Sequence, residues 1–155
     1  MKRGLDCIDQ KIISLLQENA RMTLKEIASR VYLSSPAASA RIDRLEKDGY
    51  ITGFHASINR DLIGYNIKAF VNLVVEAELK EEFITYMKQC KNVIECNCIT
   101  GDYAMLLEVI YPSTEELEQF VCKLQKYGRT QTQIVFSTAV EHRELLPDFE
   151  VEMAG

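Results

Sequence analysis

Residues 24–51 read LKEIASRVYLSSPAASARIDRLEKDGYI and predict two helices joined by a short turn. Thr23 and Glu26 have the spacing of a capping box, which marks the start of the first of these helices. Apolar residues then recur at helical spacing, at Leu24, Ile27, Ala28 and Val31. Ser35 as the cap and Pro36 at the first helical position open the second helix, because proline has no N–H to lose there. The stretch is therefore a helix pair with a connection of only a few residues.

A further helix precedes this pair. Asp6 suits the N-cap position, and Asp9 falls in the first turn, where the helix dipole favours negative charge. One apolar face follows, made of Ile8, Ile12, Leu15 and Leu16. After Gly49, residues 54–59 alternate apolar and polar, which predicts a wing or a linker strand. The N-terminal part is therefore expected to be a winged three-helix domain.

The helix that begins at Pro36 has an unusual outer face. Its inward side carries Ala38, Ile42 and Leu45, whereas its outward side carries Pro36, Ala37, Ala40 and Arg44, with Ser39 and Arg41 on the flanks. The plain alternative is an ordinary solvated face, but such a face is usually rich in Glu, Lys and Gln. Small side chains beside arginines instead suit close approach to a DNA major groove. The expected DNA contacts are Lys25, Ser34, Ser35, Ser39, Arg41 and Arg44.

The net charge of -5 is unevenly distributed along the chain. Residues 1–60 hold ten Lys and Arg against seven Asp and Glu, whereas residues 61–155 hold eight against sixteen. An acidic C-terminal part repels phosphate and leaves the N-terminal part to dock on DNA.

The second domain is expected to cover residues 61–155, after a turn-rich boundary at residues 59–66. The pattern predicts strands at 67–76, 93–100, 103–111 and 132–140, with helices at 80–91 and after Ser113. The order βαββαβ is the ferredoxin-like unit, an antiparallel sheet with both helices on one face, so the whole chain is α+β. Phe70 and Val74 would lie on the uncovered face, which suggests that two sheets meet in a dimer.

Several signals limit other functions. The longest apolar runs are too short to span a membrane, and residues 1–10 have no apolar signal core, so a cytoplasmic protein is expected. Five cysteines without a CxxC motif are expected to be reduced core residues, although Cys96 and Cys98 share a strand face and leave a metal or redox role open. His55 and His142 are expected to be surface or structural residues, and residues 142–155 an acidic tail that is only partly ordered.

The whole chain resembles the Lrp/AsnC (feast/famine) family of transcription regulators. The residues that carry the resemblance are Asp6-x-x-Asp9 with Ile12 and Leu15; Leu24-x-x-Ile27-Ala28; Val31-x-Leu33-Ser34; Arg41-Ile42-x-x-Leu45-Glu46; Gly49-x-Ile51; Leu62-x-Gly64-Tyr65; Gly101-Asp102-Tyr103; and Thr130-x-Thr132. The resemblance implies a double-stranded-DNA-binding homodimer, often assembled further to tetramers or octamers, whose C-terminal domain commonly senses an amino acid. No cofactor is implied.

With this resemblance, the Gly101-Asp102 hairpin becomes the expected effector site. Backbone N–H groups at glycine can hold a carboxylate and Asp102 an ammonium, with Thr100, Tyr103 and Thr132 within reach. The alternative is a plain hairpin in which Asp102 is only a turn former.

Three positions depart from the family pattern. Tyr32 stands at the turn where the family usually has glycine, Ala40 where a basic residue is frequent, and Ala104 where a second acid is common. These departures put one DNA contact and the affinity for an effector in question.

Two other functions remain as alternatives. The first is an architectural DNA-binding protein that responds to no ligand, since the recognition face has few donors. The second is an enzyme, because some relatives of the family are sirohaem decarboxylases. Only two histidines are present, and the sequence shows no Cys/His or Ser/His/Asp grouping, so we expect no enzyme and no catalytic residue.

Overall fold

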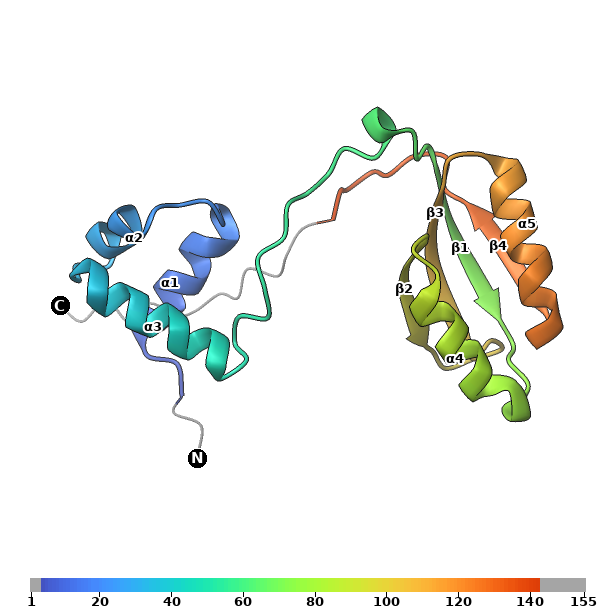
Figure 1. The fold of residues 1–155 in the computed structure, drawn as a ribbon, viewed down its shortest axis with the longest axis horizontal. Coiled ribbons are helices and arrows are strands. Elements are labelled where there is room, and N and C mark those ends of the chain that lie inside the picture. Colours follow the sequence, from blue (N-terminus) through green and yellow to red (C-terminus); the bar gives the residue numbers. More distant parts are fainter. Residues whose placement is uncertain (1–3, 143–155) are drawn as a thin grey trace. The chain divides into compact units, whose positions relative to one another are not determined.

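The computed structural model describes residues 4–142, which divide into two compact units (Figure 1). The first unit extends to Ser57 and the second is Ile58–Glu141. The tail that was predicted to be acidic and partly ordered lies, beyond His142, outside the described residues.

The first unit contains the three predicted helices, α1 (Cys7–Glu18), α2 (Leu24–Arg30) and α3 (Ser35–Lys47). Both predicted helix starts are confirmed, because Asp6 with Asp9 and Thr23 with Glu26 each form a complete capping box. The core between the helices consists of Ile12, Leu15, Ile27, Ala28, Val31, Ala38 and Leu45.

The start of α3 differs by one residue from the prediction. Ser34, not Ser35, is the N-cap, because its backbone is extended (φ -73°, ψ 154°) and its hydroxyl accepts a hydrogen bond from the N–H of Ala37. Pro36 therefore lies one position inside the helix, where its missing N–H is still harmless.

The strand predicted at residues 54–59 is not present, because this extended segment pairs with no other strand among residues 4–142. Residues 50–55 instead line a hollow of about 330 Å³ against Ile13, Leu16, Gln17 and Ala20 of α1 and the residues just after it.

The second unit has the predicted ferredoxin-like order. Its strands are β1 (Ile67–Leu73), β2 (Val93–Cys98), β3 (Met105–Tyr111) and β4 (Thr130–Ile134), and its helices are α4 (Lys80–Gln89) and α5 (Thr114–Leu124). Three short 3-10 turns, Asp61–Ile63, Ala77–Leu79 and Gln125–Tyr127, connect them. The strands form one antiparallel sheet in the order β2-β3-β1-β4.

One face of this sheet packs against both helices. Ala69, Val71 and Leu73 of β1 are fully buried there, in the same core as Phe83 of α4 and Phe120 of α5. The opposite face carries a different set of side chains, which includes Phe70, Leu106 and Ile110 beside a Lys68–Glu108 ion pair of 2.9 Å. The predicted alternation of β1 is therefore confirmed.

Every strand differs from the prediction at one boundary or more, and β1 ends at Leu73 rather than at residue 76. β4 covers residues 130–134 rather than 132–140, because its pairing with β1 ends at the Ala69–Ile134 pair. The hairpin between β2 and β3 is a loop of residues 99–104, closed by a 3.0 Å hydrogen bond from the N–H of Ile99 to the carbonyl of Ala104.

The cysteines are not the core residues that were expected. Cys7, Cys96, Cys98 and Cys122 are exposed, Cys90 is half-buried, and all five are free thiols. Cys96 and Cys98 pair with core residues of β3, but β2 is an edge strand and leaves their side chains open. Among residues 4–142, no group of three His, Cys, Asp or Glu side chains is placed to hold a metal ion.

Gly128 makes the closest backbone approach in the second unit, just before β4. Its φ is +148°, and a Cβ built on it would lie 1.8 Å from the carbonyl oxygen of Val74. The neighbouring backbone is fixed, because the N–H of Val74 donates to the carbonyl of Arg129 over 3.0 Å. No side chain fits there without separating β1 from the start of β4.

We therefore expect Gly128→Ala to lower the free energy of unfolding by about 3 kcal/mol or more, as measured by urea unfolding followed by circular dichroism. Gly64→Ala is the control, because Gly64 has a positive φ of +85° but open space around its Cβ position. Equal losses for both variants would mean that backbone strain alone, and not the contact with Val74, fixes this position.

Candidate nucleic-acid interface

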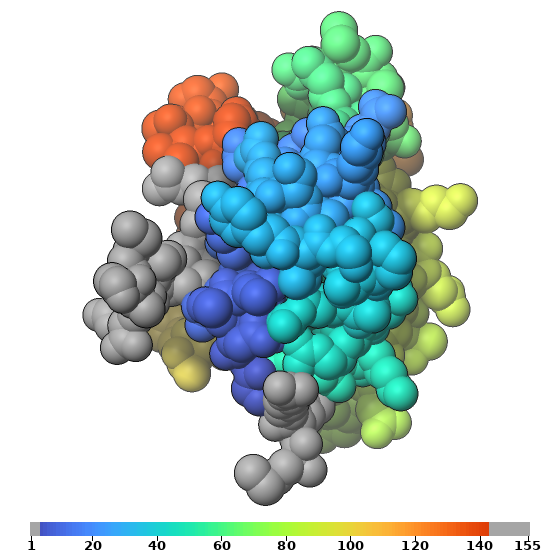
Figure 2. Space-filling model, turned by 90° about the vertical axis from the view of Figure 1, so that its left-hand side faces the viewer, coloured from blue at the N-terminus to red at the C-terminus, as the bar shows by residue number. Residues whose placement is uncertain are grey.

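The outward side of α3 is an open surface of small side chains. Pro36, Ala37 and Ala40 are exposed, and Ser39 beside them is half-buried. The three helices of the first unit (blue to cyan) face the viewer in Figure 2. A helix with so little side-chain bulk on its outer face can approach a DNA groove closely.

Arg41 and Arg44 of α3 bind the start of α1. Arg41 Nη1 lies 2.6 Å from Asp6 Oδ2 and 2.7 Å from Asp9 Oδ1, and Arg44 Nη2 donates to Asp9 Oδ2. Each arginine side chain is only 28% exposed, and the Asp9 side chain is fully buried. We call these four residues the Asp–Arg cluster.

The charges of the Asp–Arg cluster balance, with two carboxylates and two guanidiniums. Burial by itself raises the pKa of Asp9, but hydrogen bonds from Arg44 and Arg41 outweigh it and lower the pKa to about 2. The same bonds raise the pKa of both arginines, so all four groups stay charged at neutral pH. The cluster therefore fixes α3 to α1 by paired charges around the buried carboxylate of Asp9.

This finding changes the interpretation of the two arginines. Arg44 was predicted on the outward side of the helix and Arg41 on its flank, both as DNA contacts, but the structure turns their guanidiniums toward α1. Asp6 and Asp9 were treated as caps only, and their second role was missed. The sequence shows two acids three residues apart and two arginines three residues apart, each pair on one helix face, but this spacing does not show that the two faces meet.

The other predicted contacts lie around the start of α3. Ser34 is exposed and caps the helix, Ser35 is half-buried, and Lys25 is exposed on the first turn of α2. Ser34, Ser35 and Ser39 therefore surround the N-terminal end of α3 with hydroxyl groups, whereas Lys25 supplies a positive charge on the preceding helix.

Tyr32 occupies the turn between α2 and α3. Its φ is +55°, the left-handed region, and among the described residues it is the one non-glycine with a positive φ. Such a conformation costs an L-residue roughly 1–2 kcal/mol relative to an ordinary one. This is the turn at which the sequence departs from the glycine usual in the family, and the observed φ is one that glycine adopts without strain.

Four of the five predicted effector residues lie together in the loop between β2 and β3. Gly101 has a φ of +111° with open space beside it, Asp102 is exposed, and the Tyr103 ring lies 5.2 Å from the Arg129 guanidinium. Arg129 was missed by the sequence analysis, because only the sheet register brings the start of β4 to this loop.

Thr132, the fifth predicted effector residue, lies on β4 opposite Val71. Its side chain is therefore on the helix-covered face of the sheet, where its hydroxyl oxygen is buried and has no hydrogen-bond partner. A buried hydroxyl without a hydrogen-bond partner costs free energy.

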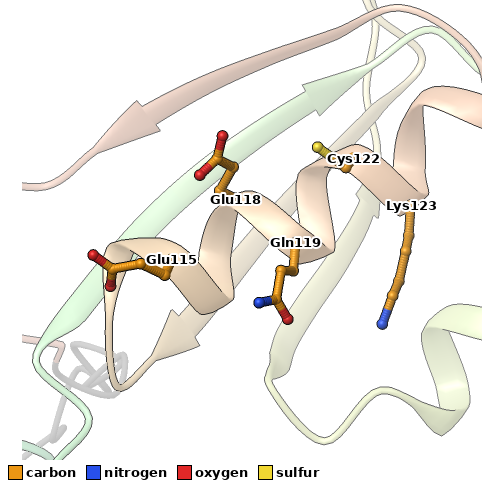
Figure 3. A pocket seen from close by; sticks show the side chains of 5 residues that line it. All are labelled: Glu115, Glu118, Gln119, Cys122 and Lys123. Atoms are coloured by element: carbon orange, nitrogen blue, oxygen red, sulfur yellow. The ribbon is translucent and has the colours of Figure 1, made fainter.

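The hollow along α5 does not compete with this loop as a ligand site. It measures about 500 Å³ and is lined by Glu115, Glu118, Gln119, Cys122 and Lys123 (Figure 3). All of these side chains project from α5 alone, so the hollow is an open helix surface.

We expect Asp9→Asn to lower the free energy of unfolding by about 3 kcal/mol, because it removes the buried partner of both arginines. Urea unfolding followed by circular dichroism measures the loss. Asp43→Asn, which changes an exposed acid on α3, is the matched control and is expected to have little effect.

The pH dependence gives a second measure of the same cluster. Since the folded pKa of Asp9 is lowered from 3.8 to about 2, its stabilisation is complete above about pH 5 and is lost as the pH falls through 2. The wild type should therefore lose about 1–2 kcal/mol more than Asp9→Asn across this window. Parallel acid profiles for the two proteins would contradict the charge assignment.

Comparison with known proteins agrees with both units. A winged helix-turn-helix DNA-binding profile matches residues 5–52, and the profile of the Lrp/AsnC ligand-binding domain matches residues 68–145. The regulator LrpA of Bacillus subtilis is 33% identical over 84% of this chain and 97% of its own length. The regulator FL11 of Pyrococcus furiosus is 34% identical over 94% of this chain and 98% of its own length.

Solved structures have the same fold. A transcriptional regulator from Neisseria meningitidis, in complex with L-methionine, superposes with a TM-score of 0.85 at 27% identity, over 93% of this chain and 97% of its own. A feast or famine regulatory protein from M. tuberculosis, complexed with L-methionine, reaches 0.86 at 28% identity, over 93% and 100%. The described residues contain no helix long and apolar enough to cross a membrane. The chain belongs to the Lrp/AsnC family and is a DNA-binding transcriptional regulator with an N-terminal helix-turn-helix domain and a C-terminal ligand-binding domain.

Proposed function

We propose that this regulator binds double-stranded DNA through the exposed side of α3 and the start of α2. The observation that carries the proposal is the small-residue face of α3, which the Asp–Arg cluster holds rigidly on α1. Residues 1–60 are the DNA-binding domain and linker, and residues 61–155 are the effector and assembly domain.

The proposed DNA contacts are Lys25, Ser34, Ser35, Ser39, Arg41 and Arg44. Lys25 binds phosphate by charge, and the three serines donate hydrogen bonds near the start of α3. Each guanidinium has five N–H donors, so Arg41 and Arg44 keep donors for a phosphate or a base while they bind Asp9.

We further propose that sequence preference is modest. Pro36, Ala37 and Ala40 have no side-chain donor and contact only apolar groups such as thymine methyls. Since both arginines are already engaged by α1, base hydrogen bonds are few, and DNA bending and shape supply part of the preference. Selection from a random duplex pool that gave sharp preference at most half-site positions would contradict this proposal.

Lys25→Gln and Ser39→Ala separate the two kinds of DNA contact. Fluorescence anisotropy with the selected duplex at several salt concentrations measures both. We expect Lys25→Gln to reduce the slope of log K against log[salt] by about 1. The variant makes one phosphate contact fewer, so its binding releases fewer counterions from the DNA. We expect Ser39→Ala to weaken binding about threefold without changing the slope, because a hydroxyl carries no charge.

Lys11→Gln is the matched control, since Lys11 is an exposed lysine on α1 outside the contact set. If Lys11→Gln and Lys25→Gln reduced the salt slope equally, binding would reflect general charge rather than the proposed surface.

The proposed effector site is the loop of residues 100–103 together with Arg129 and Thr132. An amino acid would place its carboxylate on the backbone N–H groups near Gly101 or on Arg129, and its ammonium on Asp102. The relatives solved with L-methionine support an amino acid as the class of effector.

We also propose that the chain is a homodimer or a larger homo-oligomer. The uncovered sheet face supports this, because Phe70 and Leu106 are only half-buried there in the single chain, beside Ile110, and a second sheet could cover them. An effector that binds one assembly state more tightly than another would shift the regulator between them.

Titration calorimetry with each of the twenty amino acids tests the effector site, and light scattering with and without ligand gives the particle mass. At least one amino acid should bind, and Asp102→Asn should weaken it about tenfold, because it removes the partner of the ammonium. Glu118→Gln on the outward face of α5 is the control. No heat from any amino acid would reject an amino-acid effector and favour a ligand-independent architectural protein.

We propose that the protein acts as a regulator in the cytoplasm and catalyses no reaction. The relatives named above support this proposal, because each is named as a transcriptional regulator. A haem-like absorption band on the purified protein would instead favour the decarboxylase alternative.

A further inference from the structure

The side chain of Tyr32 lies almost entirely outside the protein. It is 93% exposed, although it occupies a backbone position with a φ of +55° that favours glycine. Tyr32 is thus both a strained residue and an exposed large aromatic one. These two properties rarely coincide without a use for the side chain.

The strain at Tyr32 is not offset by contacts within the first unit. In the part of the chain that the structure describes, its ring makes no aromatic or cation–π contact and its hydroxyl no hydrogen bond. Only its backbone is held, by a 3.4 Å bond from its N–H to the carbonyl of Ser29. The folded chain therefore gains nothing from the phenol that glycine would not supply.

The place of Tyr32 identifies a partner for the exposed ring. The next residue, Leu33, packs against the core, and Ser34 then caps α3. Tyr32 therefore stands two residues before the N-cap of α3, at the end of the helix that enters the groove first in a helix-turn-helix complex. The nearest external groups at that end are the sugar–phosphate backbone atoms that border the groove.

We propose that Tyr32 is a DNA contact whose hydroxyl donates a hydrogen bond to a backbone phosphate beside the recognition helix. Tyrosine hydroxyls donate to phosphate oxygens, and such bonds set the orientation of the protein without reading sequence. Because the phenol is neutral, its contact adds affinity without releasing a counterion. This contact compensates in part for the few donors on Pro36, Ala37 and Ala40.

Three substitutions at Tyr32 test the contact with the full-length protein. Tyr32→Phe removes the hydroxyl and keeps the ring, Tyr32→Gly removes the ring and the strain, and Tyr32→Asn keeps a residue that tolerates positive φ. The probe is a fluorescein-labelled duplex selected from a random pool with the wild type. Anisotropy at several salt concentrations gives affinity, and urea unfolding gives stability.

We expect Tyr32→Phe to weaken DNA binding about threefold, and Tyr32→Gly and Tyr32→Asn about tenfold, with the salt slope unchanged. Tyr32→Gly should unfold at the same urea concentration as the wild type or a higher one. Better folding with weaker binding would exclude loss of structure as the cause. Tyr65→Phe, which removes a hydroxyl from a partly exposed tyrosine of the other unit, should bind as the wild type does.

Wild-type affinity for Tyr32→Gly at every salt concentration would overturn the proposal, and the helix-turn-helix assignment would stand because the wild type still binds the duplex. A change in particle mass for Tyr32→Gly in the absence of DNA would also overturn it, since the ring would then contact another protein chain. A loss for Tyr32→Gly that is matched by a lower urea midpoint would overturn it as well.

Discussion

The DNA-binding unit depends on the ion pairs that the buried carboxylate of Asp9 forms with Arg41 and Arg44. One side chain accepts hydrogen bonds from two arginines of α3, and it also completes the capping box that starts α1. A buried ion pair is not in general a strong source of stability, because both ions lose their hydration. What it supplies is geometry, since only one placement of α3 on α1 lets Asp6 and Asp9 satisfy both guanidiniums.

This constraint explains how a helix with a featureless outer face can still serve recognition. The alanines and the proline on the outer face of α3 have no side-chain hydrogen-bond donors for DNA. The position of α3 must therefore be set by its contacts with the rest of the first unit. The core residues Ala38 and Leu45 set its depth, and the Asp–Arg cluster limits its rotation and sliding. The arginines thus position the helix, and the donors that remain on them are the ones proposed above to bind DNA.

The ligand-binding unit separates its tasks by the two faces of one sheet. The face with Ala69, Val71 and Leu73 is closed by α4 and α5 and gives stability. The other face keeps Phe70 and Leu106 half-buried, and it is the face proposed above for association. The loop of residues 99–104 and the start of β4 meet at one end of the sheet. There the backbone at Gly101 has open space beside it, and the charged guanidinium of Arg129 lies over the Tyr103 ring.

The sequence by itself determined the elements and their class. Capping boxes, the period of 3.6 in the helices and the period of 2 in β1 are local signals, so they predicted the helix-turn-helix and the βαββαβ order correctly. The end of β4, the unpaired segment 54–59 and the exposure of Cys96 and Cys98 were not predicted, because each depends on which strand lies beside it. Tertiary structure alone decided that Arg41 and Arg44 turn to Asp9, since attraction between residues more than 30 apart in sequence requires the core to bring α1 and α3 together. It likewise brought Arg129 to Tyr103 in the loop of residues 99–104, because strand register and not sequence spacing sets that contact.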